Sequence, residues 1–585
     1  MNAQWNLDKL YKGFDDPKFV SDEAKLDLLI QENVELSQRL EGDPLEILKK
    51  VVTLLLSIQS LTDSLFNYPS LRQSANTSDA ESTAVMGRLS QKCSALSAPF
   101  ARFVQYVARI PNLDELIEQD ALLKEHKFYL SQIREQEKYV LSPEVENVIS
   151  LYSISGSSAW SDLQSYLTST VPVEYRGETT NLSDIRNKAY DADAQTRKSA
   201  YEAEIKAYDR IKDSIAYSLN SIKMEVIQRC HLRGYDSPLD ETLKSAKMKR
   251  ETLDALLGAM QEYLPKFWEY LRAKAKLLGH ENGLPWYDMF APLKGSERQF
   301  TPEECRDYLV NLFSGFDQEE ANLIQTAFDQ EWIDFFPRDG KVGGAFCASA
   351  HTIGESRVLT NYGGALSDVV TLAHELGHAF HNYCLKENTI LNTEVSMPMA
   401  ETASTFNEVV AMNAAITAEK DPIARRALIE NQLMDATQII CDIYSRYLFE
   451  SAVFERREGE FMFADKLCEM MLDAQKKAYG NGLDSEILHP YMWACKSHYY
   501  SGGLSFYNFP YAFGGLFARG LYAKYLSEGE AFVPQYKRLL KATGVSTVEE
   551  AALIANIDLT KPDFWRSSLQ LLADEIDEFI SLCNL

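Results

Sequence analysis

The sequence predicts a mainly α-helical protein with one small β-sheet. Three observations favour this fold class. Apolar residues recur at steps of three and four along most of the 585-residue chain, which is the spacing of one face of a helix. Short runs typical of strands gather between residues 335 and 366, where glycine and serine are frequent. A helical pattern that contains three histidines follows directly, so we expect the sheet to lie beside that helix.

The first 190 residues are predicted to form a helical region. From Ser21 to Lys138 the helical periodicity is almost unbroken, with a polar connection at 69–83, and a hairpin is expected within 171–184. Helical patterns resume at Asp193. We therefore expect an N-terminal helical region at 1–190 and a larger domain at 191–585 that carries the candidate functional residues.

Composition excludes several function classes. The formal net charge is -26, which argues against nucleic acid or an anionic membrane as a partner, since both need a basic face. The nine cysteines form no C-x-x-C pair and are expected to be reduced thiols. The N-terminus lacks the apolar core of a signal peptide, and no apolar run is long enough to span a bilayer. We expect a cytoplasmic protein, of unknown oligomeric state.

The segment HELGH at 374–378 is typical of a zinc site. His374 and His378 lie one helical turn apart, so both imidazoles can reach one metal ion. Glu375 projects beside that face, where it can take a proton from a zinc-activated water. Ser367 and Asp368 are predicted to begin the helix as its N-cap and first-turn acid. The alternative, a buried helix with hydrogen-bonded histidines, would leave the charge of Glu375 without a partner.

A catalytic zinc needs a third protein ligand. Glu401 and Glu408 lie seven residues apart on a second predicted helix, which begins near Pro398. If this helix packs against the first, Glu401 can complete the metal site and Glu408 can accept an imidazole N–H. A solvated acidic face is the alternative. His381 is expected to be a packing residue, because three ligands on one rigid helix cannot converge on one ion.

Two further segments are candidates for contacts with a substrate. The strand-like run at 345–348 could add a peptide as a further strand, and Gly343 and Gly344 would let its backbone approach closely; a plain structural hairpin is the alternative. The segment 498–511 combines His498 with several tyrosines. Such side chains can donate hydrogen bonds to an oxyanion, although aromatic clusters more often belong to a core.

Taken together, these motifs resemble the thimet oligopeptidase family of zinc peptidases, and most closely its oligoendopeptidase F branch. The segments that carry the resemblance are HELGHAFH at 374–381, ETASTFNE at 401–408, GGAFC at 343–347, HYYSGGLSFYNFPYAFG at 498–514, WNLDKLY at 5–11 and DLTKPDFW at 558–565. Since they run from one end of the chain to the other, the resemblance covers nearly the whole sequence.

The resemblance implies a two-lobed helical metallopeptidase fold with a deep central channel and one zinc ion per chain. It makes 191–585 the catalytic domain. It also implies that His374, His378 and Glu401 bind the zinc ion and that Glu375 is the general base. By the same resemblance, Glu408 supports the ligands, and His498 and a tyrosine stabilise the transition state.

The choice of that tyrosine is open. Members of the family often have tyrosine where this chain has Phe509, so Tyr500, Tyr507 and Tyr511 are all candidates. We favour Tyr511 and then Tyr507.

The function predicted from both arguments is zinc-dependent hydrolysis of internal peptide bonds in short, unstructured oligopeptides. One alternative is an exopeptidase that resembles dipeptidyl carboxypeptidases, which would need a fixed cation for the free carboxylate. Another is a non-catalytic peptide-binding protein on the same fold. That alternative predicts a damaged metal motif, whereas every expected ligand and the base are present.

Overall fold

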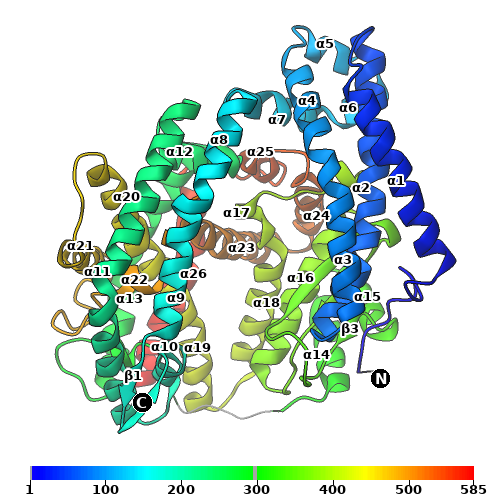
Figure 1. The fold of residues 1–585 in the computed structure, drawn as a ribbon. Helices are drawn as coiled ribbons and strands as arrows, with labels where there is room; N and C mark the ends of the chain where they lie inside the picture. The colour runs from blue at the N-terminus through cyan, green and yellow to red at the C-terminus, as the bar shows by residue number, and fades with distance from the viewer. Residues whose placement is uncertain (1–2, 294–298, 585) are drawn as a thin grey trace. The chain divides into compact units, whose positions relative to one another are not determined.

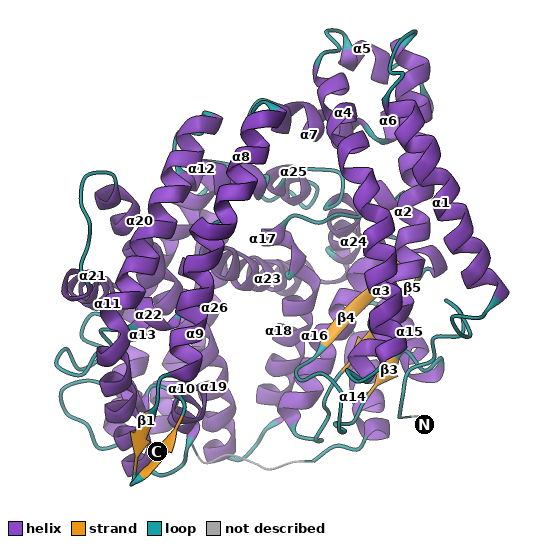
Figure 2. Ribbon diagram, in the orientation of Figure 1, coloured by secondary structure: helices purple, strands orange, loops and turns teal. Residues whose placement is uncertain are grey.

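The computed structural model of the protein describes residues 3–293 and 299–584, and it is mainly helical, as predicted (Figure 2). The chain divides into two compact units. The first comprises Met1–Tyr139, Glu297–Ala411 and Lys524–Asn556, and the second Val140–Ser296, Met412–Ala523 and Ile557–Leu585. Neither unit is one continuous stretch of sequence. The boundary expected near residue 190 stays a prediction, as do the two lobes and the deep channel.

Helices make up most of the first unit (Figure 1). They are α1 (Pro17–Ser37), α2 (Pro44–Ala75), α3 (Ala80–Cys93), α4 (Ser97–Ala108), α5 (Leu113–Ile117), α6 (Ala121–Glu125), α7 (Lys127–Glu137), α14 (Pro302–Ser314), α15 (Gln318–Asp329), α16 (Leu366–Leu385), α17 (Met397–Ala400), α24 (Val533–Ala542) and α25 (Val548–Leu553). The polar connection expected at 69–83 is shorter than predicted. Helix α2 continues through Pro69, where Tyr68 and Leu71 are also buried, because packing of the apolar face outweighs one lost backbone hydrogen bond.

The second unit is helical as well, with one small hairpin. Its elements are α8 (Pro143–Ser153), α9 (Ala159–Thr170), β1 (Val173–Tyr175), β2 (Glu178–Thr180), α10 (Leu182–Asn187), α11 (Ala194–Arg233), α12 (Pro238–Ser245), α13 (Arg250–Leu277), α19 (Pro422–Thr437), α20 (Ile443–Arg457), α21 (Ala464–Tyr479), α22 (Met492–Cys495) and α26 (Pro562–Cys583). Helices α18 (Thr402–Ala418) and α23 (Phe509–Glu528) contain residues of both units. The hairpin expected within 171–184 is confirmed by the antiparallel pair β1 and β2. Among the described residues, no helix combines the length and apolar character needed to cross a bilayer.

A three-stranded sheet lies in the first unit. It consists of β3 (Ile333–Asp334), β4 (Phe346–Ala350) and β5 (Glu355–Leu359) in the order β3-β5-β4, with β5 parallel to β3 and antiparallel to β4. Strand β4 is therefore an edge strand. Helix α16 contacts both β4 and β5 (Figure 2), which confirms the small sheet predicted beside the histidine helix.

Helix α16 begins two residues earlier than predicted. Its N-cap position is Ala365, so Ser367 does not cap it. Asp368 reaches back instead, and its Oδ2 accepts the backbone N–H groups of Gly363 at 2.9 Å and Ala365 at 3.0 Å. An acid in the first turn also interacts favourably with the helix dipole.

The second helix of the motif region is broken where the sequence predicted one continuous element. Glu401 lies between α17 and α18 with φ -94° and ψ 11°. The Ser404 hydroxyl lies 2.7 Å from Glu401 Oε2 and 3.2 Å from the backbone oxygen of Glu401. The backbone N–H of Thr405 still donates to the carbonyl oxygen of Glu401 at 3.0 Å, and the carboxylates of Glu401 and Glu408 both reach His374.

Gly377 allows α16 and α18 to pack closely. A Cβ atom added at Gly377 would lie 2.5 Å from the carbonyl oxygen of Ala403 and 2.7 Å from the Cα of Ser404. Both are backbone atoms, which a rotamer change cannot move away. The glycine at this position therefore determines how near the two helices approach each other.

We predict that Gly377→Ala destabilises the protein. The added methyl group must push two backbones apart, and overpacking of this kind typically costs about 1–3 kcal/mol. Gly87→Ala in α3 is the matched control, since a Cβ there meets nothing within 4 Å and alanine favours helix. Thermal unfolding should show a lower midpoint for Gly377→Ala and an unchanged or higher one for Gly87→Ala. Equal midpoints for both variants would contradict the steric argument.

Candidate metal centre

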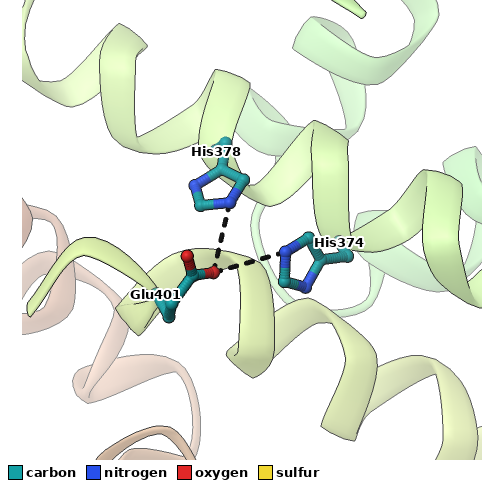
Figure 3. A group of neighbouring side chains, drawn as sticks. All are labelled: His374, His378 and Glu401. Atoms are coloured by element: carbon teal, nitrogen blue, oxygen red, sulfur yellow. Dashed lines mark ion pairs between the residues drawn. The ribbon is translucent and has the colours of Figure 1, made fainter. Parts of the chain in front are cut away.

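Three side chains from α16 and the α17–α18 junction converge on one point (Figure 3). Glu401 Oε2 lies 3.3 Å from His374 Nε2 and 3.2 Å from His378 Nε2. The two imidazole rings are nearly perpendicular, with centroids 4.9 Å apart. In the part of the chain that the structure describes, this is the one group of histidine, cysteine and acidic side chains arranged to hold a metal ion.

The two separations from the Glu401 carboxylate oxygen are compatible with a tetrahedral metal ion. Zinc binds histidine nitrogen and carboxylate oxygen at about 2.0–2.2 Å, so two ligand atoms at tetrahedral positions lie about 3.3–3.5 Å apart. The observed 3.2 and 3.3 Å agree closely with that requirement. Two imidazoles and one carboxylate also form one of the three-ligand sets typical of catalytic zinc.

Carboxylates hold the orientation of His374. Its Nδ1 lies 2.8 Å from Glu408 Oε1, while its Nε2 faces Glu401. Burial lowers the pKa of His374, but the interactions with Glu401 and Glu408 outweigh burial and raise it to about 10. The metal-free site therefore holds a protonated imidazole between two carboxylates. A metal ion has to displace that proton, since only neutral imidazole is a ligand.

Glu375 is the most enclosed acid of the motif, with 6% of its surface exposed. Burial raises the pKa of its carboxyl group, and the neighbouring His374 and His378 oppose that shift. Such an environment favours a proton acceptor that works nearer to neutral pH than an ordinary glutamate. The pKa of the Cys347 thiol on β4 is raised, mainly by the burial of that thiol and further by the nearby negative charge of Glu375. The thiol therefore stays neutral.

His381 lies outside this group, as expected. It is 4% exposed, its Nε2 lies 2.8 Å from Thr543 Oγ1 on the loop after α24, and burial lowers its pKa to about 4. It is a neutral packing histidine.

Asn407 and Glu320 form a polar link behind the centre that the sequence analysis missed. The amide nitrogen of Asn407 on α18 donates to the carbonyl oxygen of Ala373 on α16 at 3.2 Å and to Glu320 Oε1 on α15 at 2.8 Å. Glu320 is fully buried, which raises its pKa to about 8. Asn407 directly precedes Glu408 and contacts the residue before His374, so the link ties both helices together at the centre. A polar residue within an otherwise apolar helical face was the available signal.

The backbone at the start of the edge strand is open. A Cβ added at Gly343 or Gly344 meets nothing within 4 Å, and Gly344 has a left-handed φ of +77°. The Asn361 amide donates to the carbonyl oxygens of Val342 at 3.0 Å and Gly344 at 2.8 Å, which fixes this segment. The role of the two glycines in substrate binding stays a prediction.

The aromatic candidates of the second unit form a cluster of their own. His498 lies on the short helix η8 (Ser497–Tyr500), and its ring centroid is 5.2 Å from Tyr507 and 6.0 Å from Tyr511. The two tyrosine rings are 5.2 Å apart, and Tyr511 is 40% exposed. Burial, with Arg446 and Lys496, lowers the pKa of His498, so the imidazole is neutral near pH 7. Tyr500 is 1% exposed and its hydroxyl donates to the carbonyl oxygen of Trp493 at 2.9 Å, which removes it from the candidates.

Two family models match the chain. One, described as peptidase family M3, matches residues 188–571, well over half of the sequence, and another, described as oligopeptidase F, matches residues 111–171. An oligoendopeptidase F homolog of Lactococcus lactis subsp. lactis is 24% identical over 601 aligned positions, which cover 99% of this chain and 97% of that protein. Oligopeptidase PepF of Bacillus subtilis is 25% identical over 393 residues, covering 66% of this chain and 58% of the relative.

Solved structures share the fold. The crystal structure of a protein from Chlamydophila abortus superposes with a TM-score of 0.86 at 20% identity and covers 99% of this chain and 98% of that one. Oligoendopeptidase-F from Enterococcus faecium gives a TM-score of 0.70 at 19% identity, with 96% and 99% covered. Because one family model covers most of its length, the chain belongs to peptidase family M3, and the prediction of a metalloendopeptidase of the oligoendopeptidase F branch is confirmed.

Proposed function

We propose that this enzyme is a zinc-dependent endopeptidase that hydrolyses internal peptide bonds of short, unstructured oligopeptides in the cytoplasm. The observation that carries the proposal is the spacing of His374 Nε2, His378 Nε2 and Glu401 Oε2, which suits zinc, beside the enclosed carboxylate of Glu375. The names of the relatives support the substrate class. All nine cysteines are free thiols, which supports a reducing compartment.

In the proposed mechanism His374, His378 and Glu401 hold the zinc ion, which when bound polarises the scissile carbonyl and makes a water molecule acidic enough to ionise near neutral pH. The carboxylate of Glu375 takes the proton as the water oxygen adds to the carbonyl carbon. It then delivers that proton to the leaving amine nitrogen as the C–N bond breaks. Glu408 keeps His374 oriented through the 2.8 Å contact to Nδ1.

The donors proposed for the oxygen of the tetrahedral intermediate are His498 and a tyrosine, either Tyr511 or Tyr507. A neutral imidazole N–H and a phenol O–H are both suitable donors for a developing oxyanion. The proposed peptide site is the edge of β4, where Gly343 and Gly344 leave the backbone accessible and a peptide could add as a further strand.

Glu375→Gln should retain the metal and lose activity. The amide cannot accept the proton of the attacking water, so turnover should fall by about 10³-fold or more. The measurement pairs zinc content with cleavage of an internally quenched peptide of about ten residues, blocked at both ends. Glu387→Gln, an exposed acid just beyond α16, is the control and should cleave like the wild type.

Two outcomes of this experiment would count against the proposal. Cleavage by Glu375→Gln at the wild-type rate would exclude Glu375 as the base. Zinc in both proteins without cleavage in either would exclude the endopeptidase, and the same peptide with a free C-terminus would then separate an exopeptidase from a non-catalytic peptide-binding protein.

Substitution of the ligands should instead remove the metal. His374→Ala or Glu401→Ala leaves only two protein ligands, too few to hold a catalytic zinc ion. Glu408→Gln keeps all three ligands and should weaken zinc binding by about 10–100-fold, as is usual for the partner of a ligating histidine. Zinc retained after dialysis against a graded series of chelator concentrations measures both effects. Full retention by Glu401→Ala would exclude it as a ligand.

Zinc binding should release a proton and weaken as pH falls. With its pKa raised to about 10, His374 is protonated in the metal-free protein at pH 7 and must lose that proton to bind. The ion pairs of protonated His374 stabilise the metal-free protein fully below pH 6.5 and are lost as pH rises through 10. Calorimetric titration of zinc in buffers of different ionisation enthalpy counts the protons released. Release of none at pH 7 would contradict this description of the site.

A further inference from the structure

A buried hydrogen-bond network surrounds the turn that carries Tyr507. Glu450 on α20 is 2% exposed. Its Oε1 accepts the backbone N–H of Phe506 at 3.1 Å, and its Oε2 accepts the side-chain amide of Asn508 at 2.9 Å. One carboxylate therefore holds the residues on both sides of Tyr507.

Lys223 of α11 supplies the counter-charge. Its ammonium group is completely buried and lies 2.7 Å from Glu450 Oε1, and it also sits 4.7 Å from the centre of the Phe454 ring. A buried carboxylate without such a partner would be strongly unfavourable. The ion pair thus allows a charged acceptor, which binds N–H donors more strongly than a neutral one, to stay in the interior.

The turn held by this acceptor has an unfavourable backbone conformation. Phe506 has a φ of +53°, in the left-handed region that residues with a side chain avoid. Glu450 accepts the backbone N–H of Phe506, and the ring of Phe506 stacks on the ring of Phe454 with centroids 5.5 Å apart. On the other side Asn508 Oδ1 accepts the N–H of Phe509 at 2.6 Å, where α23 begins. A conformation of this kind persists because the surroundings determine it from several directions.

Tyr507 is the residue that this arrangement presents outwards. Within 505–510 every other residue is buried, and the Tyr507 ring packs against His498. We infer that Glu450, with Lys223 as its counter-ion, is a positioning residue that fixes the Tyr507 hydroxyl for transition-state stabilisation. The inference rests on the proposed role of Tyr507. Glu450 itself does not contact the substrate in this scheme.

A double-mutant cycle tests the inference. In the wild type, Glu450→Gln should lower kcat by about tenfold or more and change KM by less than about twofold, because a misplaced transition-state donor affects the chemical step. In the Tyr507→Phe background the same substitution should lower kcat by less than about twofold, since the group it positions is already gone. Zinc content should stay unchanged throughout. Glu455→Gln, an exposed acid on the same helix, is the matched control.

Asn508→Ser provides an independent arm if Glu450→Gln does not fold. It removes the side-chain amide that donates to Glu450 but keeps an oxygen near the N–H of Phe509. It should lower kcat in the wild type and have little effect on kcat in the Tyr507→Phe background. An equal loss of kcat in both backgrounds would overturn the inference and leave the role of Tyr507 intact. Wild-type kcat in Tyr507→Phe alone would overturn the proposed role of Tyr507, and this inference with it.

Discussion

The close approach of α16 and α18 at Gly377 is the constraint on which the proposed metal centre depends. Two histidines one turn apart on a single helix cannot enclose an ion, so the third ligand must come from another segment. The missing Cβ lets the backbone of residues 403 and 404 lie against α16, and this contact brings the Glu401 carboxylate within 3.2–3.3 Å of both imidazoles. Asn407 then joins the same two helices through a hydrogen bond to Ala373.

The electrostatics of the site follow from the same packing. Three carboxylates, those of Glu375, Glu401 and Glu408, lie close to His374 and His378. Without a cation, their negative charges would repel one another in a partly buried site. In the metal-free protein the positive charge of protonated His374, whose pKa is raised to about 10, partly balances these carboxylates. A divalent ion can replace that proton and interact with the carboxylates more strongly. We therefore expect acidic groups beyond the proposed ligands to contribute to metal binding as well as to orientation.

The sequence was sufficient for the parts of the site that depend on local periodicity. The spacing within HELGH places His374 and His378 on one helix face, and the seven-residue spacing from Glu401 to Glu408 pointed to a second helix, although the structure breaks it at Glu401. What could not be predicted depends on contacts between distant segments. The bond of Asn407 to Glu320 spans 87 positions. Glu450, 56 positions before Phe506, lies in a helix with no motif.

The most direct test of the metal centre is anomalous diffraction at the zinc absorption edge from crystals of the zinc-loaded enzyme. The account predicts a single strong peak about 2.0–2.2 Å from each of His374 Nε2, His378 Nε2 and a carboxylate oxygen of Glu401. A peak bound to other side chains, or none at these three residues, would contradict it.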